Sequence, residues 1–114
     1  MIATLTMRTI PEGNARERWQ GRHRRRKGQR NTAALLVRHA LRAEPVEGPW
    51  LVTMTRVAPS RGLDAHDGLP MSLKAVVDGV ADALGIDDAD PRVTWAYAQK
   101  RGAYAVIVSI EART

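Results

Sequence analysis

The chain has 114 residues, a length that fits one domain with one hydrophobic core and leaves no room for separate binding and catalytic domains. Its 18 Lys and Arg residues outnumber its 12 Asp and Glu residues, and the net charge of +6 favours a polyanionic partner such as nucleic acid. The absence of cysteine excludes disulfides and thiolate metal sites, and no apolar run is long enough to span a bilayer, so we expect a cytoplasmic protein without membrane association.

The first half of the chain predicts a strand, a long helix and a second strand. Residues 2–9 alternate apolar and polar side chains, as a half-buried strand does, and Pro11 then breaks the pattern. A helix is expected over residues 14–43, with Asn14 as its N-cap; its first part is basic and its second part has an apolar stripe. Residues 50–57 alternate again and predict the second strand.

The second half predicts a loop, a helix and a hairpin. Residues 58–67 have no periodicity and are expected to form the loop. The helix over residues 69–84 has the strongest signal in the chain, because its Leu and Val residues fall on one stripe. An acidic turn follows. Residues 92–98 and 103–110 then alternate on either side of Lys100-Arg101-Gly102, which predicts a hairpin.

These elements predict a single α/β domain of the α+β type over residues 1–114, in the order β-α-β-α-β-β. We expect a mixed sheet of about four strands with two main helices. The domain then consists of a basic helical segment at 14–43, a catalytic loop and helix at 59–90, and a C-terminal hairpin at 92–111.

Positive and negative charges are segregated along the chain. Residues 16–30 contain eight Arg or Lys and one Glu, whereas residues 64–90 contain seven Asp and one Lys. A nucleic-acid hydrolase needs both parts, a phosphate-binding surface and a cation-binding pocket. The segregation therefore favours this class of protein more than either cluster alone would.

The basic segment is a candidate DNA-binding surface. Guanidinium groups suit bidentate contacts to phosphate, and only Glu17 lies nearby in the sequence to neutralise them. A solvated helix face or a localisation tract is the alternative, and nothing in the segment specifies a base sequence. The candidate DNA-binding residues are Arg22, Arg24, Arg25, Arg26, Lys27 and Arg30.

The acidic loops are a candidate Mg2+ site, because this ion takes one or two carboxylates and completes its shell with water and phosphate oxygens. A helix of about sixteen residues is roughly 24 Å long, so the two loops meet only if one folds back or a second subunit completes the site. Simpler roles remain open: Asp67 as an N-cap, Asp90 as a turn residue, and Lys74 paired with Asp78 at i, i+4. Asp78 and Asp82 are expected on the solvated helix face.

Other catalytic motifs are absent from the sequence. No G-x-x-x-x-G-K-[ST] or G-x-G-x-x-G loop occurs, so we expect no nucleotide cofactor. Neither Ser60 nor Ser72 lies in a G-x-S-x-G context, which argues against a serine hydrolase.

Three segments resemble the RusA family of Holliday junction resolvases. They are Leu63-Asp64-Ala65-His66-Asp67-Gly68-Leu69, Leu73-Lys74-Ala75-Val76-Val77-Asp78 and Gly85-Ile86-Asp87-Asp88. The family pattern is an Asp-x-Asp-Asn-Leu motif that opens a helix, a Lys and an Asp four residues apart on that helix, and an Asp-Asp pair after it. Proteins of this family are small α/β homodimers, common in phages and prophages, that cleave four-way DNA junctions with Mg2+.

The resemblance implies a Mg2+-dependent endonuclease that resolves branched DNA in recombination and repair. Asp67, Asp88 and Lys74 match the family motifs, and Asp64 matches if one residue is inserted; Gly68 replaces the usual asparagine. The implied metal ligands are Asp64, Asp67 and Asp88, with Lys74 as a fourth catalytic residue. The alternatives are a catalytically inactive RusA-like DNA-binding protein and a protein-interaction module whose acidic turn is only structural.

Overall fold

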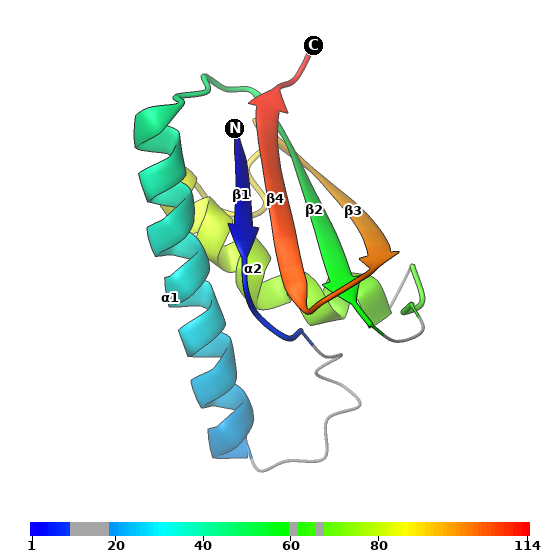
Figure 1. Ribbon diagram of the computed structural model, residues 1–114. Helices are drawn as coiled ribbons and strands as arrows, with labels where there is room; N and C mark the ends of the chain where they lie inside the picture. The colour runs from blue at the N-terminus through cyan, green and yellow to red at the C-terminus, as the bar shows by residue number, and fades with distance from the viewer. Residues whose placement is uncertain (10–18, 60–61, 66–67) are drawn as a thin grey trace.

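A four-stranded mixed sheet and two helices make up the computed structural model of the chain (Figure 1). The structure describes residues 1–9, 19–59, 62–65 and 68–114. The elements are β1 (Ile2–Leu5), α1 (Trp19–Ala43), β2 (Trp50–Ala58), α2 (Gly68–Leu84), β3 (Val93–Arg101) and β4 (Ala105–Ala112). The predicted α+β class and the element order are confirmed. No helix in the described ranges is long and apolar enough to cross a membrane.

The strand order is β1-β4-β2-β3, so the predicted C-terminal hairpin at 92–111 is wrong. β3 pairs in parallel with β2, and β4 pairs antiparallel with the other side of β2. The connection from β3 to β4 crosses the end of β2, where the Gly102 N–H donates to the Ala58 carbonyl at 3.0 Å (Figure 1). The physical reason is that β2, α2 and β3 form a β-α-β unit, in which the helical crossover makes the two strands parallel.

Two further boundaries differ from the sequence prediction. β1 ends at Leu5 instead of residue 9, because its last partner Val106 is the second residue of β4, which leaves at most one further residue to pair with. Lys100 and Arg101, predicted in a turn, belong to β3. The described part of α1 begins at Trp19, so the proposed N-cap Asn14 lies outside the described residues.

The core lies between the helices and one face of the sheet. α1 contributes its predicted apolar stripe, and α2 contributes the Leu and Val residues of its own. The most deeply buried members are Leu5, Ala33, Val37, Val52, Met54, Leu73, Val76, Val80, Val106, Val108 and Ile110, all fully enclosed. Full burial of each Val or Leu side chain stabilises the fold by about 1.5–3 kcal/mol.

At Gly79 the backbones of α1 and α2 pack closely together. A methyl group in its place would lie 2.5 Å from the Arg30 carbonyl oxygen and 2.7 Å from the Ala33 Cβ. Small residues on both helices therefore bring the two backbones together. This crossing places the basic half of α1 beside the first turns of α2.

Replacement of Gly79 by alanine is expected to destabilise the protein by about 1–3 kcal/mol, because the methyl group overpacks the helix crossing. Gly28 is a matched control on α1, with nothing within 4 Å of the added methyl. Gly28→Ala should instead stabilise by up to about 1 kcal/mol through helix propensity. Urea unfolding of both variants measures the change in the free energy of unfolding. A change of the same sign in both variants would contradict the close packing at Gly79.

Candidate functional site

Lys74 is the centre of a charged cluster on α2. Its Nζ donates to Asp78 Oδ1 at 3.0 Å and to Asp88 Oδ2 at 2.6 Å. Asp78 follows at i+4 on the same helix, whereas Asp88 belongs to the loop that follows α2. The pairing with Asp78 confirms one of the simpler roles open from the sequence. Asp78, expected to be a solvated bystander, is thus part of the cluster.

The loop after α2 folds back along the helix and so brings Asp88 to Lys74. α2 ends at Leu84; the next residue, Gly85, has φ +71°, and the Ile86 N–H donates to the Ala81 carbonyl at 3.0 Å. This left-handed glycine with a long return bond is the Schellman pattern of helix termination. The Trp95 Nε1–H then donates to the Asp88 carbonyl at 2.8 Å. Strand β3 therefore holds the backbone of Asp88 in place.

The structure describes one of the other two predicted metal ligands, Asp64. Asp64 is exposed in the segment before α2, and its carbonyl accepts the first-turn N–H of Leu69 at 2.8 Å. Asp67 lies outside the described residues. Within the described ranges, no three Asp, Glu or His side chains form a group that could hold a metal ion. The structure therefore joins Asp88 to Lys74 and leaves the set Asp64, Asp67 and Asp88 a prediction.

The ion pair shifts the pKa of both partners. The hydrogen bond from Lys74 is the main cause that lowers the pKa of Asp88, and the bond to Asp88 is the main cause that raises the pKa of Lys74. A lowered carboxyl pKa adds stability above the unfolded value, near pH 4, which is lost as the pH falls through the folded value. The raised pKa of Lys74 adds stability that is fully present below the pKa of an unfolded lysine. This stability is lost as the pH rises through the pKa of Lys74 in the folded protein.

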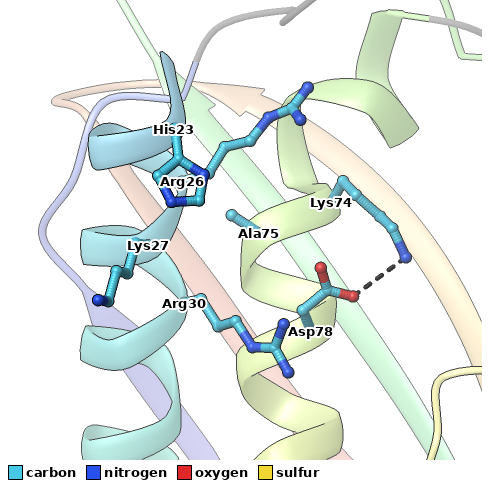
Figure 2. A pocket seen from close by; sticks show the side chains of 7 residues that line it. All are labelled: His23, Arg26, Lys27, Arg30, Lys74, Ala75 and Asp78. Atoms are coloured by element: carbon cyan, nitrogen blue, oxygen red, sulfur yellow. Dashed lines mark hydrogen bonds and ion pairs between the residues drawn. The ribbon is translucent and has the colours of Figure 1, made fainter. Parts of the chain in front are cut away.

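The basic half of α1 faces this cluster across a hollow of about 310 Å³. Figure 2 shows Arg26 extending from α1 toward the first turns of α2, with Arg30 reaching toward Asp78. A second hollow, of about 290 Å³, lies beside the first and shares Arg26 and Lys74 with it. The first is lined by His23, Arg26, Lys27, Arg30, Lys74, Ala75 and Asp78. The second is lined by Arg26, Pro70, Met71, Lys74 and Tyr97.

Arg30 is paired, although the sequence suggested that only Glu17 was near enough to neutralise the basic segment. Its Nε donates to Asp82 Oδ2 at 2.7 Å and its Nη2 to Asp82 Oδ1 at 2.9 Å. The hydrogen bond between them is the main cause that raises the pKa of Arg30 and lowers the pKa of Asp82. Asp82 is therefore not a solvated bystander, and Arg30 has its charge neutralised within the protein.

The remaining candidate DNA-binding residues all lie on α1. Arg24, Arg26 and Lys27 are exposed, and Arg25 is half-buried. Arg22 belongs to the same helix, but its side chain is outside the described part. Arg26 differs from the others because it reaches both hollows.

Sequence reasoning missed the part that β3 plays in the site. Val52, Met54 and Trp95 share one face of the sheet with Tyr97, because the strand register pairs Val52 with Trp95 and Met54 with Tyr97. Trp95 holds Asp88, and Tyr97 lines the second hollow, where burial raises its pKa. The alternation of the two aromatic residues was visible in the sequence. Their proximity to Lys74 was not, because it depends on how α2 packs on the sheet.

Comparison with known proteins supplies no activity for this site. No protein-family model and no solved structure matches the chain. It is 37% identical over 78 residues to an uncharacterized protein from Xylella fastidiosa (strain Temecula1 / ATCC 700964), and the match covers 66% of this chain and 51% of that protein. The chain thus spans about half the length of this relative.

Replacement of Lys74 by methionine should raise the pKa of Asp88 toward its ordinary value, because the main hydrogen bond that holds the carboxylate ionised is lost. Asp90 is an internal control, since Arg92 lowers its pKa to about 2 and Lys74 does not contribute. NMR titration of the carboxyl groups in both proteins measures the shifts. An unchanged Asp88 titration would contradict the ion pair.

Proposed function

We propose that the protein is a Mg2+-dependent endonuclease of the RusA type that acts on branched DNA. The observation that carries the proposal is the Lys74 cluster: a lysine between two carboxylates, 2.6 Å from Asp88, on the edge of a hollow whose opposite wall is the basic half of α1. This arrangement brings together the two clusters that are separate in the sequence. Phosphodiester hydrolysis needs such a combination of cation-binding and phosphate-binding groups.

The carboxylates of this site have the chemistry that Mg2+ requires. Their hard oxygen donors are partly exposed, at 27% for Asp78 and 38% for Asp88, and one or two such ligands suffice for this ion. In the proposal Asp88 holds the ion with Asp64 and Asp67. Bound Mg2+ would activate water and neutralise charge on the phosphate.

The chain's own cations would position the substrate. Lys74 is flexible and 55% exposed, so its ammonium can turn from the carboxylates to a phosphate oxygen and stabilise the charge that develops there. Arg26 reaches both hollows and is suited to hold the same strand. Arg24 and Lys27, exposed on α1, would contact neighbouring phosphates. We further propose a cytoplasmic homodimer, whose two-fold symmetry would suit symmetric cleavage of a four-way junction.

One observation favours the alternative of a DNA-binding protein without catalysis. Lys74 already donates to Asp88 Oδ2 at 2.6 Å, so a cation bound at this carboxylate would compete with the ammonium for the same negative charge. Gly68, in place of the family's usual asparagine, lies in the first turn of α2, which begins just after Asp67. The two candidates share a DNA-binding surface and differ only in hydrolysis.

Cleavage of a synthetic four-way junction distinguishes them. The full chain is incubated with the junction in Mg2+ or in EDTA, beside Asp88→Asn and the control Asp90→Asn. The control removes a carboxylate of the same turn, one that is paired with Arg92. The endonuclease predicts Mg2+-dependent nicking that falls at least about 100-fold in Asp88→Asn and persists in Asp90→Asn. Tight binding of the junction without nicking supports the DNA-binding protein without catalysis. Failure to bind at low salt contradicts both.

The salt dependence of DNA binding should separate Arg30, which is paired with Asp82, from the exposed cations Arg24 and Lys27. Arg24→Gln and Lys27→Gln are each expected to reduce the slope of log affinity against log salt by about 0.9, because each removes one phosphate contact. Arg30→Gln should change the slope little, since Asp82 already neutralises this guanidinium. Fluorescence anisotropy across a series of salt concentrations measures the three slopes, and a full-sized change in Arg30→Gln would show that Asp82 releases it.

A further inference from the structure

A third hollow, of about 200 Å³, lies where β2 and β3 end. Its lining residues are Arg56, Gly62, Gln99, Lys100 and Arg101. Three of the five are cations and none is a carboxylate. In an open sheet, ligands commonly bind beyond the carboxyl ends of parallel strands, and β2 and β3 are the parallel pair.

Arg56 is the unusual member of this hollow because it is only 6% exposed. It shares a sheet face with Val52 and Met54, which turns it toward the buried side of β2. Its Nη2 donates to the Thr9 carbonyl at 3.3 Å, and its buried Nε has no hydrogen-bond partner in the described part of the chain. Among the described residues no carboxylate forms an ion pair with it.

An unpaired buried guanidinium is costly, because the charge loses water and gains no counter-ion. Burial is the main cause that lowers the pKa of Arg56, and the neighbouring charge of Arg8 acts in the same direction. An anion in the hollow would remove this penalty. Phosphate suits the position best, since its oxygens accept hydrogen bonds from a guanidinium fork.

The wall of the hollow is already in place. Gln99 holds the segment before α2, because its Oε1 accepts the Leu63 N–H and its Nε2 donates to the Leu63 carbonyl, both at 2.8 Å. A methyl group on Gly62 would lie 2.9 Å from the Gln99 Oε1, so glycine keeps this wall close to β3. A site with fixed walls loses little conformational entropy when it binds a ligand.

We propose that Arg56, Lys100 and Arg101 form a phosphate site that takes one oxyanion, from free phosphate or from a nucleic-acid backbone. Arg56 supplies a buried positive charge at the wall of the hollow, and Arg101, which shares its sheet face, lines the hollow from β3 beside Lys100. The inference goes beyond the proposed endonuclease, because it needs neither Mg2+ nor cleavage. It also uses none of the residues assigned to the Lys74 cluster.

Titration of the full chain with inorganic phosphate at constant ionic strength tests the site. Backbone amide signals of Gly62 and Gly102 should move with phosphate and fit one binding isotherm, while that of Gly28, in the basic segment of α1, should not. At ten times its dissociation constant, phosphate should shift the unfolding equilibrium about 11-fold toward the folded state. A single-stranded oligonucleotide in a parallel titration identifies a backbone phosphate as the source.

Arg56→Met should abolish both responses, and it removes the buried charge without removing the volume of the side chain. If this variant does not fold, the exposed pair Lys100→Gln with Arg101→Gln should still weaken phosphate binding at least fivefold. Arg42→Gln removes one exposed charge at the far end of α1 and is the matched control.

Each outcome decides the proposal. The proposal is supported if the pocket variants lose the response to phosphate or to the oligonucleotide while Arg42→Gln keeps it. The ligand that gives the response in the unaltered protein identifies the source of the phosphate. A response that survives Arg56→Met, or no response to either ligand, overturns the proposal. Absence of junction cleavage in the earlier assay leaves this result unaffected, so the two proposals fail separately.

Discussion

The helix crossing at Gly79 is the contact on which the candidate site depends. At this residue the α1 backbone approaches α2 so closely that a methyl group would lie 2.5 Å from the Arg30 carbonyl oxygen. The crossing fixes the distance between the basic half of α1 and Lys74, which lies five residues before Gly79. It also brings Arg30 to Asp82, three residues after Gly79. A wider crossing would separate the cations from the carboxylates and leave two unrelated surfaces.

Charge pairing across the crossing divides the basic segment into two kinds of residue. Arg30 and Asp82 neutralise each other and tie α1 to α2, although such partly exposed pairs contribute little stability, about 1 kcal/mol or less. Arg24 and Lys27, nearer the start of the helix, are exposed to solvent. Lys74, on α2, combines the two properties, because it is paired with Asp78 and Asp88 and still lines the first and second hollows.

The sequence predicted local structure well and long-range pairing poorly. The α2 helix and the Lys74–Asp78 pair follow from helical periodicity, which depends on neighbours a few residues apart. The Arg30–Asp82 pair joins residues 52 apart, and no local pattern reports it. The hairpin prediction failed because β3 and β4 are consecutive in the chain, while β2 lies between them in the sheet. The burial of Arg56, in contrast, was available from its alternation with Val52 and Met54.

Strand β3 extends the candidate site in one direction. The Trp95 side chain donates a hydrogen bond to the Asp88 backbone, and Tyr97 lies beside Lys74. Gln99 holds the segment that carries Asp64, and Arg101 lines the third hollow, between the ends of β2 and β3. These four side chains alternate along one strand at about 6.8 Å intervals, so the row is about 20 Å long. That is about half of the longest dimension of the molecule, 40 Å. A ligand that touches both ends of this row must itself be about 20 Å long, which describes a polymer and excludes a single nucleotide.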